Sequence, residues 1–217
     1  MSADLRSAMR NFATGVCVVT TYADRTDGRR HDAVTVNSLT SVSLDPPLVS
    51  LCLRLDSRFL IDLLETKKWA VSILDGGAGD VASSLAKDRA ARAATIDALC
   101  ASPGYHTGAL VLDAPSWLEC VLWGSFDIGD HTMVIGEVVA AEVQPRRPAL
   151  VFVHGHYHAM EDTRLRVQVR SRTPDRPSDT MPVADSRGDS RTQSTRPGDR
   201  TGPLPVAAPV CDSPTAC

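Results

Sequence analysis

The stretch VTVNSLTSVSLDPPLVSLCL, residues 34 to 53, predicts two β-strands joined by a polar connection. Its second half is an apolar run that begins after Pro46-Pro47, and the proline rings fix the backbone of the connection. The sequence therefore predicts strands at 33–43 and 48–54, with a row of small polar groups beside a hydrophobic core. Five short hydrogen-bonding side chains crowd the first half: Asn37, Ser38, Thr40, Ser41 and Ser43.

The regular alternation of the first strand breaks at Ser38-Leu39-Thr40. On either side of the break, Thr35, Asn37, Ser41 and Ser43 would face one side of the sheet. We therefore expect the chain to bend or leave the sheet there, which frees backbone N–H and C=O groups that need partners. A planar heterocycle with donor and acceptor edges would satisfy them. A solvated strand face explains the same polar row and stays open as an alternative.

The composition is that of an ordinary globular protein. The 217 residues carry a net charge of −3 without a basic stripe, which argues against a general affinity for nucleic acid or anionic lipid. The first residues are polar and no run approaches the roughly 18 apolar residues of a membrane span. Six cysteines lack CxxC spacing, which suits buried thiols in a reducing compartment. We therefore expect a cytoplasmic protein without a signal peptide.

The chain changes character near residue 160. All ten aromatic residues lie between Phe12 and Tyr157, whereas eight of the fourteen prolines lie beyond residue 160. A segment so poor in apolar side chains cannot bury enough surface to offset its chain entropy. We expect one folded domain over 1–160 and a disordered Pro-, Arg-, Asp- and Ser-rich tail over 161–217.

The folded part predicts about eight strands and three helices, the helices at 4–13, after Ser57 and at 80–100. The helices interrupt the strands at only two internal points, which argues against a parallel doubly wound sheet. We expect a mainly β fold with peripheral helices, either a closed or a half-closed antiparallel barrel. The segment 77–82 matches GxGxxA, but no strand ending in an acidic residue follows it, so we interpret it as a turn.

Several side chains in the apolar segments are predicted to be structural. Cys52 and Cys120 are expected to be buried and inert, and Glu119 to be a charge at a sheet edge or a dimer contact. Each tryptophan of the chain lies in an apolar run and is expected in the core, namely Trp69, Trp117 and Trp123.

Two polar positions are candidates for ligand binding or catalysis. Asp56-Ser57-Arg58 opens a predicted helix, and a helix N-terminus with a hydroxyl and an arginine suits a phosphate. Ser57 as a simple helix cap is the alternative. His131 lies in a Gly-Asp-His turn, where it either bonds the backbone or moves a proton, because histidine titrates near neutrality.

A run of alternating histidines follows near the end of the folded part. His154, His156 and His158 would share one side of a strand. Carboxylates in a matching arrangement are lacking, so we expect no metal site.

The segment T-V-N-S-L-T-S-V-S-L-D-P-P-L-V, followed by a serine-containing helix start, resembles the flavin reductases of two-component monooxygenases. Leu118-Glu119-Cys120 with the segment 129–138, and the strand 150–153 with His154-Gly155-His156-Tyr157, extend the resemblance over about residues 5 to 158. The resemblance implies an FMN-binding split β-barrel that forms a homodimer. It also implies an NAD(P)H:flavin oxidoreductase whose reduced FMN or FAD diffuses to a partner monooxygenase.

The resemblance further implies which residues meet the two cofactors. Cys52, Ser57 and Arg58 would border the ribityl chain and phosphate, and the segment 83–87 would close over the flavin. His131 would be catalytic near the nicotinamide or the flavin, and Tyr157 would lie near the nicotinamide. The isoalloxazine ring would lie against one continuous segment, formed by Val36, Asn37, Ser38, Leu39 and Thr40.

The expected chemistry is hydride transfer from NADH or NADPH to the flavin, which needs orientation by the protein rather than a nucleophile or a metal. Two other interpretations stay open. One is a flavoprotein oxidase or monooxygenase that retains FMN, and the other is a non-enzymatic flavin- or haem-binding barrel.

Overall fold

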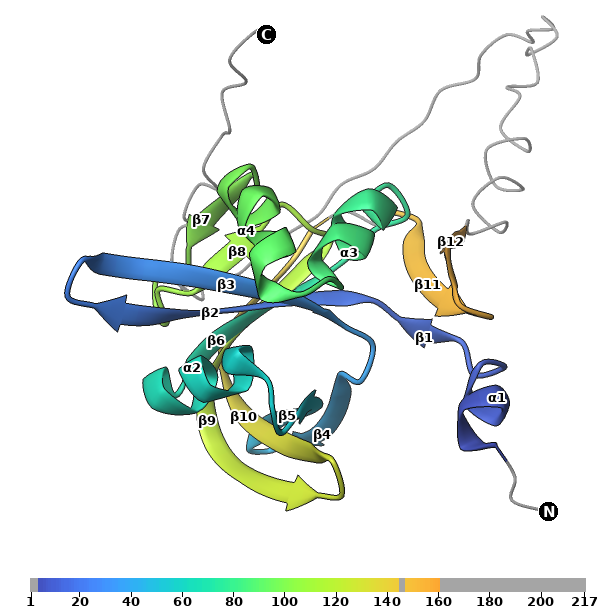
Figure 1. Ribbon diagram of the computed structural model, residues 1–217, viewed down its shortest axis with the longest axis horizontal. Helices are drawn as coiled ribbons and strands as arrows, with labels where there is room; N and C mark the ends of the chain where they lie inside the picture. Colours follow the sequence, from blue (N-terminus) through green and yellow to red (C-terminus); the bar gives the residue numbers. More distant parts are fainter. Residues whose placement is uncertain (1–3, 145–146, 161–217) are drawn as a thin grey trace, which may run out of the picture. The chain divides into compact units, whose positions relative to one another are not determined.

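The structure is a computed structural model that describes residues 4–144 and 147–160 (Figure 1). The mainly β class with helices at the periphery is confirmed in these residues. The predicted tail over 161–217 lies outside them. The helices are α1 (Leu5–Met9), α2 (Arg58–Thr66), α3 (Gly79–Leu85) and α4 (Arg89–Asp97). The strands are β1 (Thr14–Gly15), β2 (Cys17–Arg25), β3 (Gly28–Val36), β4 (Thr40–Leu44), β5 (Pro47–Arg54), β6 (Lys68–Ile73), β7 (Ala101–Pro103), β8 (Leu110–Leu112), β9 (Ser116–Ile128), β10 (His131–Val143), β11 (Ala149–Val153) and β12 (His156–Met160).

Seven strands form one sheet in the order β3-β2-β6-β9-β10-β5-β4, and every pair of neighbours in it is antiparallel. Its core is built on Trp69, which is fully buried among side chains of β2, β5, β10 and α2. Gly136 makes room for this indole, because a Cβ at that position would collide with the ring. A residue without a side chain is therefore required where β10 crosses the largest core side chain.

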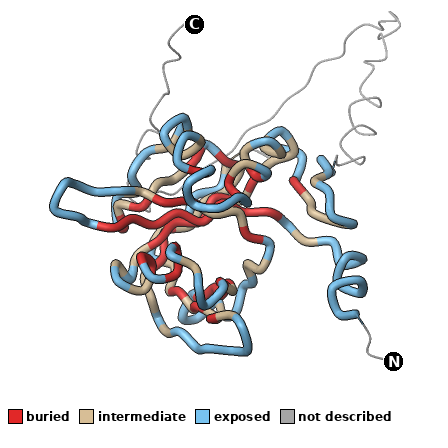
Figure 2. Tube along the Cα trace, viewed as in Figure 1, coloured by how far each residue is buried: buried red, intermediate tan, exposed pale blue. Residues whose placement is uncertain are grey.

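Two smaller sheets flank the large one. β7 pairs with β8, and β1 and β12 pair with the two edges of β11. The His154 N–H at the β11–β12 turn donates to the Arg10 carbonyl at 2.9 Å, so the hairpin is also tied to the segment after α1. α1 itself is capped by Asp4 but leaves Leu5 and Met9 exposed (Figure 2).

Helix α2 forms where the sequence predicts a capped amphipathic helix. The Ser57 side chain accepts a hydrogen bond from the Leu60 N–H, which satisfies a donor that the helix leaves unpaired. Phe59 and Leu63 are buried against the large sheet. The helix ends at Thr66, and the residue after it, Lys67, adopts the left-handed conformation common at C-termini.

Two predicted segments differ from the structure. The strand predicted over 33–43 is two strands, because β3 ends at Val36 and β4 begins at Thr40. The helix predicted over 80–100 is also two, because the Asp88 side chain accepts from the Ala91 N–H and starts α4 anew. The short strand β7 and the return strand β12 were not predicted.

Three of the predictions for core and edge residues are wrong. Trp123 is 56% exposed on β9 and Trp117 is only half-buried, whereas Trp69 is buried as predicted. Glu119 is 1% exposed rather than an edge charge, and its Oε2 accepts from the N–H groups of His106 and Thr107 and from the Thr107 hydroxyl. These bonds give the buried carboxylate the partners that it needs, so Glu119 fixes the loop between β7 and β8.

The two cysteines that were predicted to be inert differ from each other. Cys120 is buried, and burial raises the pKa of its thiol to about 12, so it stays protonated and unreactive. Cys52 is only half-buried, contrary to the prediction.

A chain of ion pairs ties α2 and α4 to the β2–β3 hairpin. The buried Asp62 of α2 meets Arg25 at 2.9 Å and Arg89 at 2.7 Å. The buried Asp32 of β3 meets Arg92 at 2.9 Å and Arg89 at 3.4 Å. Each buried carboxylate thus has two arginines, which offsets the cost of removing its charge from water.

Within the described ranges, none of the helices is long and apolar enough to cross a membrane.

Candidate functional site

A cavity of about 120 Å³ opens where the end of β3, the end of α3 and the β11–β12 hairpin meet. Val16 and Phe152 give it apolar walls, and Thr35, Val36, Asn37, Ala86 and Tyr157 complete the lining. Three of the sequence-predicted residues are therefore brought together, although 120 positions separate Asn37 from Tyr157 in the chain.

The β11–β12 hairpin delivers the aromatic side of this cavity. Phe152 pairs with Tyr157 across the two strands, and their rings pack at 5.2 Å between centroids. The Tyr157 hydroxyl is protonated near neutrality, as in any ordinary tyrosine, and can donate a hydrogen bond; burial raises its pKa further. The hairpin thus offers an aromatic face and a polar tip in one place.

The predicted bend between β3 and β4 is present at residues 37–39. The Ser38 hydroxyl accepts from the Cys52 N–H at 3.1 Å and lies 3.3 Å from the Cys52 carbonyl, to which it can donate. Leu39 packs against the buried core, and Thr40 resumes pairing opposite Ser50. The small hydroxyl therefore holds the bend against β5, and Asn37 is left at the edge of the cavity.

Ser57 and Arg58 lie at the start of α2, beyond the end of β5. The Ser57 hydroxyl caps the helix, so the alternative role weighed from the sequence is the one that the structure displays. Arg58 is exposed as the first residue of the helix. Their role toward a phosphate stays a prediction.

His131 begins β10 opposite Arg54, the last residue of β5. Its Nδ1 lies 2.7 Å from Asp130 Oδ1, and this hydrogen bond holds the pKa of Asp130 below its usual range. His131 is therefore near the β5–α2 corner and does not line the cavity that contains Tyr157. When Nδ1 donates to the carboxylate, Nε2 is the nitrogen left for other partners.

The three alternating histidines do not share one strand, as the sequence had suggested. His154 lies in the β11–β12 turn with φ near +54°, and only His156 and His158 belong to β12. No cluster of three or more His, Cys, Asp or Glu that could hold a metal occurs in the described part of the chain.

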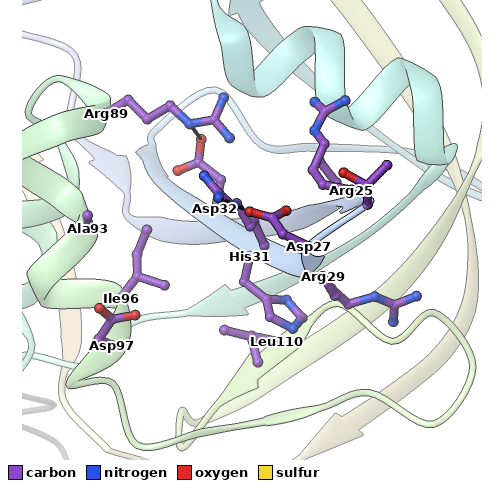
Figure 3. A pocket seen from close by; sticks show the side chains of 13 residues that line it. Arg25, Asp27, Arg29, His31, Asp32, Arg89, Ala93, Ile96, Asp97 and Leu110 are labelled. Atoms are coloured by element: carbon purple, nitrogen blue, oxygen red, sulfur yellow. Dashed lines mark hydrogen bonds and ion pairs between the residues drawn. The ribbon is translucent and has the colours of Figure 1, made fainter.

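A larger groove of about 890 Å³ lies between the β2–β3 hairpin and α4 (Figure 3). None of the sequence-predicted site residues lines it. Its arginines already have carboxylate partners: Arg30 pairs with Asp27, Arg29 with Asp24, and both Arg25 and Arg89 with Asp62. Charges that are satisfied within the protein leave little attraction for an anion, so this groove is the weaker candidate.

Sequence reasoning missed the residues that hold α3 and α4 near the cavity. Thr35 Oγ1 donates to the Ala82 carbonyl at 2.8 Å, and Arg92 bonds both Asp32 and the Lys87 carbonyl. Asp32 follows Arg29-Arg30-His31 in the sequence, so the pattern gave no sign that its carboxylate would be buried and would require a partner. Nothing in the sequence showed that the partner was Arg92.

Comparison with known proteins identifies the family of the chain. Residues 9–161 match the flavin reductase like domain. The NADH-dependent FAD reductase of Streptomyces globisporus is 35% identical over 155 residues, which are 70% of this chain and 82% of that protein.

Two solved structures are similar in both sequence and fold. BorF, the flavin reductase component of a bacterial two-component tryptophan halogenase, is 37% identical with a TM-score of 0.67, over 75% of this chain and 99% of that one. The styrene monooxygenase flavin reductase from Pseudomonas putida S12 is 28% identical with a TM-score of 0.61, over 73% of this chain and 98% of that one. Since the match runs from residue 9 to residue 161, this chain belongs to the flavin reductase-like family.

Proposed function

We propose that this chain is an NADH-dependent flavin reductase that supplies reduced flavin to a partner monooxygenase. The family match over residues 9–161 carries the proposal. A relative described as an NADH-dependent FAD reductase supports NADH and FAD as the substrates. The styrene monooxygenase reductase and the halogenase reductase support a role as the reductase half of a two-component system.

The flavin ring is assigned to the cavity at the end of β3. Val36 and the apolar wall beside it suit a flat ring face, whereas Asn37 and the Tyr157 hydroxyl suit its polar edges. Leu39 and Thr40 continue this segment, and the Ser38–Cys52 bonds keep its backbone in place. Ser57 and Arg58, at the mouth of α2, are assigned to the phosphate because helix N–H groups and a guanidinium both attract it.

The two bound cofactors supply the chemistry, which is hydride transfer from the nicotinamide ring to the flavin ring. The protein binds both rings in one site and keeps their faces in register. His131 is assigned as the catalytic residue. Its Nδ1 bond to Asp130 fixes the imidazole, so that Nε2 can orient the nicotinamide or deliver a proton near the reduced flavin.

A homodimer of split barrels, each formed by residues 1–160, completes the proposal. The cavity of about 120 Å³ is smaller than the roughly 300–1,000 Å³ of small-molecule sites, so further walls are needed. A second copy would supply them and cover apolar side chains that are otherwise exposed. These side chains are Val42, Leu44, Trp123, Phe126, Ile128 and Val143.

The dimer has a direct test. Sedimentation equilibrium is expected to give twice the 23.3 kDa mass of the chain. The mass of a single chain at micromolar concentration would contradict the shared site.

The activity is tested by mixing the purified protein with NADH or NADPH, with and without added FAD or FMN, and following nicotinamide absorbance. We expect NADH oxidation that depends on added flavin, because the flavin is a substrate that leaves after reduction. Turnover by a yellow protein without added flavin would favour an oxidase or monooxygenase that retains FMN. Bound flavin without nicotinamide consumption would favour a non-enzymatic carrier.

An alanine-to-glutamate substitution in each of the two cavities tests which of them binds the flavin. Ala86→Glu puts a carboxylate into the smaller cavity, and Ala93→Glu puts one into the groove beside α4. We expect Ala86→Glu to weaken FAD binding about tenfold or more, because an unpaired carboxylate would be buried under the ring. Ala93→Glu should bind as the wild type does in titrations of flavin fluorescence. The opposite ranking would move the flavin to the larger groove.

The role of His131 is tested by His131→Ala, with His158→Ala on the exposed face of β12 as its control. We expect kcat to fall about tenfold or more in His131→Ala, because the orienting or proton-donating group is gone. Flavin affinity should stay close to that of the wild type in both variants. Unchanged turnover in His131→Ala would remove this residue from the mechanism.

A further inference from the structure

Arg92 joins three separate elements through one guanidinium group. It extends from α4, where it is 8% exposed, and its Nη2 donates to both oxygens of Asp32 on β3 at 2.9 and 3.0 Å. Its Nη1 donates to the carbonyl of Lys87, between α3 and α4, at 2.9 Å. The planar fork of arginine makes this triple contact possible, whereas an ammonium group presents a single point charge.

The contact to Lys87 lies next to a wall of the flavin cavity. Ala86, the residue before Lys87, lines that cavity. On the other side of Ala86, the Ala82 carbonyl accepts from the Thr35 hydroxyl of β3. The last turn of α3 is therefore held to β3 at both of its ends, and Ala86 lies between the two attachments.

Strand β3 supplies both attachments and also the opposite wall of the cavity. Asp32 and Thr35 are three residues apart on this strand. Thr35 also lines the cavity, together with the two residues that follow it, Val36 and Asn37. The distance between the Ala86 wall and the β3 wall is thus set by bonds that start from a single strand.

Stability alone is a weak reason for this arrangement. A buried ion pair costs desolvation energy that an apolar pair of similar size avoids. Arg92 carries a further cost, because its buried Nε lacks a hydrogen-bond partner in the described residues. The apolar contacts of Ala82 and Leu85, both fully buried, already attach the body of α3 to the core. What Arg92 adds is the fixed position of the junction after α3.

We propose that Arg92 is a positioning residue for flavin binding, which acts by holding the α3–α4 junction so that Ala86 stays at the correct distance from β3. This proposal rests on the proposed function, because it assigns the cavity to the flavin ring. It does not give Arg92 any contact with the flavin, and it does not involve the hydride transfer itself.

The same helix offers a matched control. Arg89 lies one turn before Arg92, and it also pairs with Asp32, at 3.4 Å, and with Asp62, at 2.7 Å. Its side chain is 41% exposed, and its ion pairs are with Asp32 and Asp62 rather than with the junction. Loss of Arg89 therefore removes ion pairs from the same network without releasing the end of α3.

The test compares Arg92→Leu, Arg89→Leu and the double variant Asp32→Asn/Arg92→Leu. The double variant removes the buried Asp32 charge, which Arg92→Leu leaves with only the longer contact to Arg89 at 3.4 Å. The amide that replaces the Asp32 carboxylate still offers an oxygen to the Ala33 N–H, which now donates to Asp32. Melting temperature, FAD affinity by fluorescence titration, and amide exchange of residues 82–92 in the flavin-free protein are measured for each.

We expect FAD affinity to fall about fivefold or more in both variants that lack Arg92, and to stay near the wild-type value in Arg89→Leu. The melting temperature should drop in Arg92→Leu and recover in the double variant, but the affinity should not recover. The KM for flavin should rise with kcat at saturating flavin unchanged. Amide exchange at 82–92 should be faster wherever Arg92 is missing.

Three results would overturn the proposal: FAD affinity that recovers together with the melting temperature, an equal loss of affinity in Arg89→Leu, or unchanged exchange at 82–92. The exchange measurement needs no flavin, so it tests whether Arg92 holds the α3–α4 junction in place even if the wild type binds no flavin. Wild-type protein that binds no flavin and oxidises no NADH would instead refute the proposed function.

Discussion

The site depends on the two hydrogen bonds that join the Ser38 hydroxyl to the backbone N–H and C=O of Cys52. They close a bend that the sheet alone would not make, because β-branched residues on both sides favour continuous strand. With the bend in place, β3 stops at Val36 and the next residue reaches the cavity edge. A hydroxyl is the smallest side chain that can bridge two backbone groups in this way, which explains the serine at the bend.

The cavity is assembled from segments that lie far apart in the sequence. Residues 35–37 give one wall, Ala86 a second, and the hairpin with Phe152 and Tyr157 a third. Each wall has its own support: the bend on β5, the attachments of α3 to β3, and the pairing of β1 with β11. A ligand that touches all three walls would sense a shift in any one of them, which is how distant substitutions come to affect binding.

The sequence predicted the elements that follow local rules. The capped helix after Ser57, the mainly β class and the bend near Ser38 came from spacing and turn chemistry, and the structure bears out all three. The predictions failed where the burial of a residue depends on partners that lie far away in the sequence. Glu119 was predicted to be a charge at a sheet edge or a dimer contact, because its partners belong to a loop and a loop gives no periodic signal.

The flavin assignment came from the resemblance rather than from periodicity, and the family match supports it. The roles of the individual site residues do not follow from the fold in the same way. A β-sheet pattern places Val36 and Asn37 on a strand end, but it cannot show which segments of the chain close over them. Alternation likewise put three histidines on one strand, whereas the turn at His154 separates the first from the other two.

The segment that follows the exposed helix α1 contributes to the position of the β11–β12 hairpin. The carbonyl of Arg10 accepts a hydrogen bond from the His154 N–H, and Thr14 pairs with Phe152, so residues 10–15 support the hairpin that bears Tyr157. A fusion or a truncation at this end would therefore shift the hairpin that carries Phe152 and Tyr157, although residues 10–15 do not line the cavity. Affinity tags on this chain are therefore better placed elsewhere.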